Sequence, residues 1–195
     1  MKVWKSLAVC LPLFMLTQGC GGTLYMREAL PNEVLVAPPP GKVLVNIHRP
    51  SDYGGNRLYS LFDKTRFMGL SEGEQRFQYV CDPGEHVFIG YLNGSIWATV
   101  SVIKADLLPD KIYDCVIDAG YFTSSIAVNP LPQADKRRPK LPDWDEDQTT
   151  MVLDDATNFG AWEADQAEDN EEILKEFVKG EKKDRLKQLA KSDHR

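Results

Sequence analysis

The sequence contains few of the residues that build metal and redox centres. Its 195 residues include three histidines and four cysteines. No histidine occurs in an HExxH pattern or at the spacing of a metal-binding pair, and no two cysteines form a CxxC motif. We therefore expect no metal site and no cofactor.

Positive charge is also scarce. The chain has 23 Lys and Arg against 29 Asp and Glu, which gives a net charge of −6. General nucleic-acid binders need clustered basic residues to neutralise phosphates, so nucleic acid is not an expected partner. Apolar residues make up 43% of the chain, enough for a hydrophobic core, and the length fits one domain with extensions or two small domains.

No apolar run is long enough to cross a membrane. The longest N-terminal run covers residues 7–16, follows Lys2 and Lys5, and contains Pro12. A transmembrane helix needs about 20 apolar residues, and a proline weakens a long helix further. A basic start followed by a short apolar run is typical of a secretory signal, which we assign to residues 1–19.

The end of this signal resembles the lipobox of bacterial lipoproteins. The segment reads Leu16-Thr17-Gln18-Gly19-Cys20. Its last two residues match the lipobox, the two before them depart from it, and the leucine stands one place early. The resemblance implies a diacylglyceryl thioether on Cys20, cleavage before it, and acylation of the new amine. The alternative is ordinary signal cleavage, which leaves Cys20 free or disulfide-bonded.

Lipid on Cys20 would make the membrane the first partner of the chain. Several acyl chains hold a protein on a bilayer far longer than one chain does. Gly21 follows the cysteine, where an aspartate would resemble an inner-membrane retention signal. We therefore expect a lipid-anchored protein of the cell envelope, on the outer membrane and facing the periplasm.

Two cysteines remain after Cys10 leaves with the signal and Cys20 takes the lipid. Cys81 and Cys115 end up on the apolar faces of two expected strands. An even number of cysteines in an oxidising compartment makes them a candidate disulfide. The alternative is two buried free thiols, which pack as small hydrophobes.

Residues 42–128 have the pattern of a β-domain, with short strands rich in β-branched and aromatic residues. The expected strands are Val43–Arg49, Arg57–Asp63, Gln75–Cys81, Glu85–Tyr91, Ser95–Lys104, Lys111–Asp118 and Phe122–Val128. Asp82-Pro83-Gly84 and Asn93-Gly94 are turn signals and predict an antiparallel meander. The fold class is mainly β: a small antiparallel β-sandwich or open barrel, followed by a C-terminal helical tail.

Three short motifs in this domain resemble a family of small bacterial lipoprotein β-domains of unknown function, similar in plan to PEGA-type domains. The motifs are Val45-Asn46-Ile47-His48-Arg49-Pro50-Ser51, Asp82-Pro83-Gly84-Glu85-His86 and Asp110-Lys111-Ile112-Tyr113. In that plan a hairpin displays a small residue, here Gly69. The resemblance covers about residues 42–120 and implies a compact β-sandwich in the envelope.

The remaining segments differ in composition from this domain. Residues 20–41 are expected to be a tether with an edge strand at Val34–Val36, and residues 129–143 a proline-rich linker. Residues 144–195 are acidic, then basic, and predict a helix over Glu171–Ala190 and a shorter one near Asp155–Gln166. An amphipathic helix must bury its apolar face, either on the β-domain or on an envelope protein partner.

These features favour a membrane-anchored envelope lipoprotein with a non-catalytic β-domain that binds or scaffolds something. The alternative is an envelope hydrolase that uses Ser71 or carboxylates of the tail. Gly69-Leu70-Ser71-Glu72-Gly73 fits the GxSxG pattern, but that motif needs a helix after the serine, and here a strand is expected. A third option is a calcium-dependent adhesin-like module, although no EF-hand spacing occurs.

Overall fold

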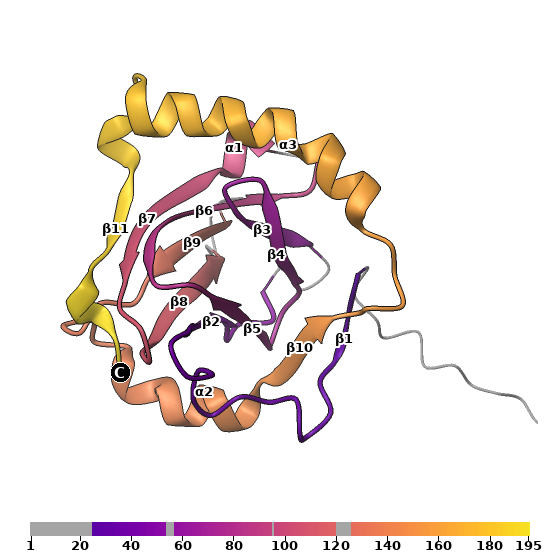
Figure 1. Cartoon of the computed structure of the whole chain (residues 1–195), viewed down its shortest axis with the longest axis vertical. Helices are drawn as coiled ribbons and strands as arrows, with labels where there is room; N and C mark the ends of the chain where they lie inside the picture. The colour runs from indigo at the N-terminus through magenta and orange to yellow at the C-terminus, as the bar shows by residue number, and fades with distance from the viewer. Residues whose placement is uncertain (1–24, 54–56, 95, 120–125) are drawn as a thin grey trace, which may run out of the picture.

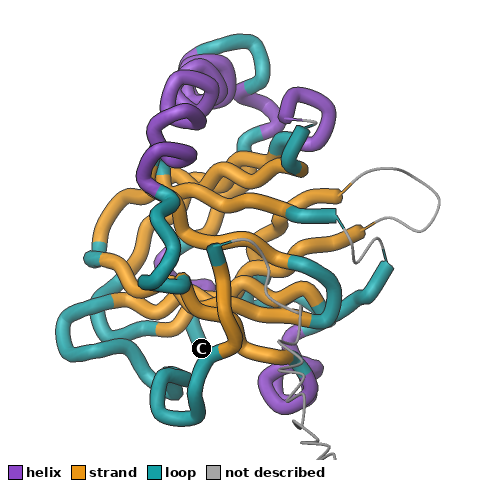
Figure 2. The backbone as a smooth tube through the Cα atoms, turned by 90° about the vertical axis from the view of Figure 1, so that its right-hand side faces the viewer, coloured by secondary structure: helices purple, strands orange, loops and turns teal. Residues whose placement is uncertain are grey.

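Two β-sheets packed face to face, each with a helix on its outer face, form the protein (Figures 1 and 2). The structure is a computed structural model that describes residues 25–53, 57–94, 96–119 and 126–195. The predicted mainly β fold is confirmed. The two sheets do not close into a barrel.

The first sheet has the strand order β1-β10-β5-β2-β8-β9. Its strands are β1 (Met26–Glu28), β2 (Val43–Arg49), β5 (Gln75–Cys81), β8 (Ile112–Ala119), β9 (Ile126–Pro130) and β10 (Thr149–Leu153). The central strand β2 is antiparallel to β5 but parallel to β8. The sheet is therefore mixed, whereas the sequence predicted antiparallel pairing.

The second sheet has the order β11-β7-β6-β3-β4. Its strands are β3 (Tyr59–Asp63), β4 (Arg66–Ser71), β6 (Gly84–Leu92), β7 (Ser101–Leu107) and β11 (Lys187–Leu189). The strands β3 and β4 form a hairpin with an irregularity between Leu61 and Phe62 in their register. The bounds of β2 and β5 match the expected strands, and those of β3, β6 and β8 differ from them. Residues 122–125 of the expected strand Phe122–Val128 lie outside the described residues, and β9 ends at Pro130.

The expected three-strand meander is wrong. Asp82-Pro83-Gly84 does not join neighbouring strands, because β5 pairs with β2 and β10 while β6 pairs with β3 and β7. The turn instead carries the chain from one sheet to the other. The strand expected over Ser95–Lys104 begins only at Ser101, because the helical turn α1 (Ile96–Thr99) comes first. The Thr99 hydroxyl accepts a hydrogen bond from the Leu92 amide at 2.9 Å.

The core lies between the sheets and is rich in aromatic side chains. Tyr59, Phe77, Phe88 and Tyr113 are at most 1% exposed. Gly90 leaves room for the Tyr59 ring of the neighbouring strand β3 and for Val128 of the other sheet, because a Cβ there would lie 2.6 Å from Tyr59 and 3.0 Å from Val128. The Tyr59 hydroxyl in turn accepts a hydrogen bond from the Val128 amide at 3.1 Å, which links the two sheets.

Helix α3 (Gly160–Leu174) covers the outer face of the second sheet (Figure 1). The Trp162 ring lies 5.5 Å from Phe62 and 5.0 Å from Phe67, centroid to centroid. The helix continues as a π-helical turn over Lys175–Lys179 and buries Ile173 and Phe177 in the core. Its apolar face therefore packs on the β-domain, one of the two outcomes expected for it.

The predicted bounds of the tail helices are wrong. One helix over 160–174 and its π-turn replace the two expected helices, and β11 occupies 187–189 inside the longer one. Gly180 adopts an extended backbone, with φ −97° and ψ −159°, and ends the helical run. Leu189 instead lies in β11, which runs parallel to β7.

The segments expected as tether, linker and tail all join the sheets. The N-terminal segment supplies β1, while Val34–Val36 form no strand. The expected linker holds the end of β9, the 3-10 turn Arg138–Lys140 and the start of helix α2 (Leu141–Asp147). The tail supplies β10, β11 and the 3-10 turns Lys183–Arg185 and Lys191–Asp193.

Candidate functional site

Cys20, the expected lipidation site, lies outside the described residues, together with the rest of the expected signal. The chain becomes described at Tyr25, and Met26 is already part of the core at 3% exposure. In the described part of the chain, no helix combines the length and the apolar character that a membrane crossing requires.

The expected Cys81–Cys115 disulfide is wrong in this structure, where both thiols are free and buried. Both side chains do face the core, as the strand pattern predicted. Cys81 is paired with Val43 and Cys115 with Ile47, on opposite sides of β2 and four residues apart along it. Two strand spacings and four residues separate the Cα atoms by about 16 Å. A disulfide requires less than about 7 Å.

Ser71 is the last residue of β4 and is fully buried. Its hydroxyl donates to the Glu72 carbonyl at 3.0 Å, and its own carbonyl accepts from Arg49 at 2.8 Å. A turn and the strand β5 follow, as the sequence predicted, instead of a helix. Ser71 therefore does not sit on the strand-to-helix turn that exposes the serine of a GxSxG hydrolase.

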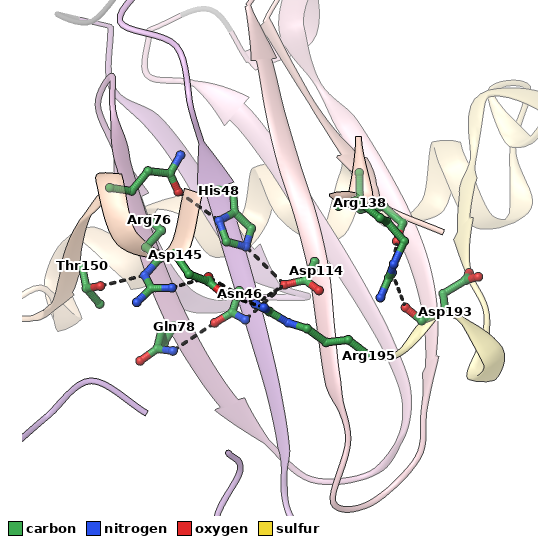
Figure 3. Close-up of polar contacts among 12 residues, drawn as sticks. Asn46, His48, Arg76, Gln78, Asp114, Arg138, Asp145, Thr150, Asp193 and Arg195 are labelled. Carbon is green, nitrogen blue, oxygen red and sulfur yellow. Dashed lines mark hydrogen bonds and ion pairs between the residues drawn. The ribbon is translucent and has the colours of Figure 1, made fainter. Parts of the chain in front are cut away.

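A network of polar side chains occupies the outer face of the first sheet (Figure 3). Asp114 on β8 is its centre, and one carboxylate oxygen of Asp114 contacts Asn46 at 3.1 Å, His48 at 3.2 Å and Arg195 at 2.9 Å. Asn46 and His48 come from β2, whereas Arg195 arrives from the C-terminal segment. Figure 3 shows the Arg195 side chain reaching across the sheet to this carboxylate.

The same network extends to helix α2. Arg195 also binds Asp145 at 2.5 Å, and Arg76 on β5 forms an ion pair with the same carboxylate. The second ring nitrogen of His48 contacts the Gln148 side-chain oxygen at 2.9 Å, and the Trp144 ring lies 5.7 Å from the imidazole. The outer face of the sheet is thus sealed by α2 and the C-terminal segment.

The centre of this network, His48 and Asp114, is closed to solvent and contacts no nucleophile in the described part of the chain. The side chains of His48 and Asp114 are fully buried. Burial alone would raise the pKa of Asp114, but the His48 hydrogen bond and the Arg195 charge outweigh it and hold this pKa below its usual value. No Ser, Thr or Cys hydroxyl or thiol binds His48 among the described contacts. We conclude that the network fastens the tail to the sheet.

A second polar cluster lies where the core ends, at the turn between β5 and β6. Asp63, Tyr79, Cys81 and His86 share the inward faces of their strands with core residues. The Asp63 carboxylate accepts from the Tyr79 hydroxyl at 3.1 Å and contacts His86 Nδ1 at 2.5 Å. These four residues line a surface cleft of about 380 Å³.

The His86 imidazole is held in its charged form. Hydrogen bonds to Asp63 and Cys81 raise the pKa of His86 to about 10, although burial opposes the shift. The other ring nitrogen, Nε2, lies 2.9 Å from the Asp82 carbonyl. Burial, with the nearby Asp63 charge, raises the pKa of Tyr79, so the phenol is neutral at neutral pH. The cluster therefore combines an imidazolium, a carboxylate and a thiol beside solvent.

Basic side chains form the rim of this cleft. Lys42 binds Asp82 at 2.7 Å, and the Arg66 guanidinium lies 5.9 Å above the Tyr79 ring. Lys64 also lines the cleft. Neither Lys64 nor Arg66 forms an ion pair within the described part of the chain, so both charges face any ligand that enters.

A shallower groove separates α3 from β6. Val87, Leu174 and Val178 supply its apolar lining, and Lys64, Lys175 and Lys179 surround it with Glu171. No group of three or more His, Cys, Asp or Glu in the described ranges is placed to hold a metal ion.

Sequence reasoning found part of the open cleft. It placed His86 in the expected strand Glu85–Tyr91, and the structure has this residue in β6, where its imidazole contacts Asp63. It singled out Cys81, but for a disulfide. It missed Asp63, because a carboxylate at a strand end carries no sign of the histidine that faces it 23 residues later.

Comparison of the chain with models of protein families, with curated proteins and with solved structures found no match.

Proposed function

We propose that the protein is a lipid-anchored lipoprotein of the bacterial cell envelope whose β-domain binds or scaffolds other molecules and performs no catalysis. The lipobox-like sequence ending in Cys20 carries the proposal. Its position directly after a basic start and a short apolar run is the position where lipoprotein signals end.

The short distance between Cys20 and the fold supports this proposal. Met26 already lies in β1, six residues after Cys20. Six residues span at most about 20 Å when fully extended. A lipid on Cys20 would therefore hold the sandwich against the membrane surface, with the edge strand β1 nearest to the bilayer.

The location of polar chemistry supports a binding role over hydrolysis. The buried histidine–aspartate pair of the first sheet has no nucleophile and no access to solvent, and Ser71 is fully buried. The open surfaces include a small cleft with a basic rim and a shallow apolar groove. Such surfaces suit recognition of a ligand or a protein.

The proposed envelope partner of the C-terminal helix would meet an acidic surface. The apolar residues Ile173 and Phe177 are used within the chain. The exposed positions of α3 include Asp165, Glu168, Glu171 and Glu172. We therefore expect a partner that docks on α3 to present basic residues, and its binding to weaken as salt is raised.

Metabolic labelling with an alkyne analogue of palmitate tests the anchor. Wild-type protein should carry the label and appear in the membrane fraction, and Cys20→Ala should lose both. Cys10→Ala is the matched control, because Cys10 leaves with the proposed signal and its loss should not affect labelling. Equal label in wild type and Cys20→Ala would refute lipidation at this residue. Separation of inner and outer membranes then tests the proposed location.

A further inference from the structure

We propose that one side of α3 and its π-helical turn docks on the anionic phospholipid headgroups of the membrane. We name this surface the basic groove. Two hollows lie along it, next to the turn that joins β3 to β4: one of about 590 Å³ beside Phe159 and Ala164, and one of about 370 Å³ beside Leu174 and Val178. The inference rests on the lipid anchor proposed above, which supplies the nearby bilayer.

The two hollows share one side of the helix. Their helical lining residues are Gly160, Glu163, Ala164 and Ala167 in the first hollow and Glu171, Leu174, Lys175 and Val178 in the second. Steps of three and four residues connect these positions, which is the spacing of a single helix face. The side that packs on the sheet is a different one and carries Trp162, Ile173 and Phe177. The basic groove therefore remains open along the whole helical run.

The basic groove is positive, although the chain is acidic. Lys64, Lys175 and Lys179 line the second hollow, Arg66 lines the first, and none of the four forms an ion pair within the described residues. The negative groups are Glu171 and Glu163, and the Glu163 carboxylate accepts a hydrogen bond from the Phe67 amide at 2.5 Å. Four cations against two anions stand out in a chain of net charge −6. An anionic surface complements this arrangement.

The floor of the basic groove is apolar. Phe67 and Phe159 line the first hollow, and Val87, Leu174 and Val178 line the second. Lysine side chains can lay their apolar stems along such a floor and keep the ammonium group at a phosphate. Apolar side chains flanked by lysine and arginine are the combination by which peripheral proteins bind the boundary between headgroups and acyl chains.

The acidic residues of α3 fix which side can approach a membrane. Asp165, Glu168 and Glu172 are exposed and do not line either hollow. An anionic lipid surface would repel these three carboxylates and attract the lysines of the basic groove. The helix can therefore meet such a surface only with its groove side.

The start of the described chain brings the bilayer to the same place. The Tyr25 ring lies 6.3 Å from Phe67 and 6.4 Å from Phe159, centroid to centroid, and both of these residues line the first hollow. Cys20 precedes Tyr25 by five residues, which span at most about 17 Å when fully extended. A lipid on Cys20 would therefore hold this end of the basic groove close to the headgroups.

Vesicle flotation tests the proposal on the full-length chain with Cys20→Ala, which removes the anchor. Vesicles contain phosphatidylcholine alone or an equal mixture with phosphatidylglycerol. Binding to the neutral vesicles measures the background from the apolar run 7–16, which this variant retains. The test variant adds Lys175→Gln and Lys179→Gln. The matched control adds Lys136→Gln and Lys140→Gln, two exposed lysines in the segment that leads into α2, on the opposite side of the molecule (Figure 1).

We expect the chain to bind the phosphatidylglycerol vesicles above background and to lose this binding as salt is raised. Each basic residue at an anionic surface strengthens binding about fivefold. The Lys175→Gln and Lys179→Gln pair should therefore weaken the binding at least about tenfold. The Lys136→Gln and Lys140→Gln pair should change it by less than about twofold. Circular dichroism should be the same for both pairs.

A photoreactive side chain reports which side of α3 meets the lipid. Benzoylphenylalanine replaces Val178 in the basic groove or Asp165 on the acidic side, and each protein is irradiated with vesicles that contain alkyne-labelled phosphatidylglycerol. We expect label on the chain substituted at Val178 and much less on the chain substituted at Asp165. In intact cells the same Val178 substitution should capture phospholipid.

Four outcomes would overturn the proposal: no phosphatidylglycerol-dependent binding, equal weakening by the two lysine pairs, equal labelling at Val178 and Asp165, or capture of a protein or a second copy of the chain at Val178 in cells instead of lipid. Palmitate labelling separates this inference from the anchor. Label on Cys20 with a negative vesicle result refutes the basic groove alone. Vesicle binding as expected with no label on Cys20 refutes the anchor and leaves the lipid-binding surface standing.

Discussion

Replacement of Arg195 by alanine should weaken the attachment of the C-terminal segment to the first sheet. The Arg195 guanidinium binds Asp114 at 2.9 Å and Asp145 at 2.5 Å, and the Asp114 side chain is fully buried. Loss of one partner from a fully buried ion pair costs about 3–5 kcal/mol. Arg195 is 27% exposed, and Asp114 keeps His48 and Asn46. We therefore expect Arg195→Ala to lower the free energy of unfolding by about 2 kcal/mol.

The variant should also respond differently to acid. The folded state holds the pKa of Asp114 below its ordinary value of 3.8. A depressed pKa of this kind stabilises the fold above the ordinary value and ceases to do so as pH falls through the folded value. Without the Arg195 charge the folded pKa of Asp114 moves back toward its ordinary value, so this carboxylate contributes less stability at neutral pH and less pH dependence in acid. The difference in unfolding free energy between wild type and Arg195→Ala should therefore shrink as pH falls through the range in which Asp114 is protonated.

Urea denaturation followed by tryptophan fluorescence measures both effects, at about neutral pH and across an acid series. Lys191→Ala is the matched control, because Lys191 belongs to the same segment but binds Asp106 with side chains that are 57% and 42% exposed. Its loss should cost less than about 1 kcal/mol. If Arg195→Ala costs no more than Lys191→Ala, then the buried network does not hold the tail, and our account of the outer face fails.

Three further perturbations test other parts of the structure. The pKa of His86 is raised from 6.5 to about 10, so its contribution to stability is complete below pH 6.5 and is lost as pH rises through 10. Urea titrations should therefore show the free energy of unfolding falling between these two pH values in wild type, and His86→Gln should not show this fall. Gly90→Ala should lower the free energy of unfolding by about 2–3 kcal/mol, because the new methyl would lie 2.6 Å from the Tyr59 ring. Gly160→Ala is the control. Its methyl would meet only an Asn158 oxygen at 3.4 Å, so the free energy of unfolding in urea should change by less than about 1 kcal/mol. Trp162→Ala should cost about 2–3 kcal/mol and reduce near-ultraviolet circular dichroism, because this ring packs on Phe62 and Phe67 beneath α3; an unchanged spectrum would contradict that packing.

The strands themselves could be predicted where local patterns were strong. The bounds of β2 and β5 follow from dense β-branched and aromatic residues between turn signals. Their partners could not be predicted. Asp82-Pro83-Gly84 has the composition of a hairpin turn, yet it joins strands of different sheets. A turn fixes the local direction of the chain, and the packing of distant residues decides which edge the next strand meets.

The strands of the C-terminal tail also could not be predicted from the sequence. Its short strands β10 and β11 have three to five residues, too few for a periodic pattern, and each pairs in parallel with a strand far away in the sequence. Leu186 and Leu189 are three residues apart and Ile173 and Phe177 are four apart, and both spacings place residues on one face of a helix. The extended backbone at Gly180 ends the helix, and residues 187–189 then pair with the edge of β7 as a strand.

The two strand histidines illustrate how the fold assigns chemistry that the sequence leaves open. His48 and His86 both alternate with apolar residues, and each faces an aspartate from another strand. His48 points outward from a central strand, where α2 and the Arg195 side chain close over it. His86 points inward, but near the start of β6, where the core ends and a cleft begins. The exposure of each imidazole therefore depends on its position along the strand rather than on the face of the sheet that it occupies. Solvent reaches the imidazole that lies between the sheets and not the one on the outside, so a ligand that needs a charged imidazole must enter at the β5–β6 end of the sandwich.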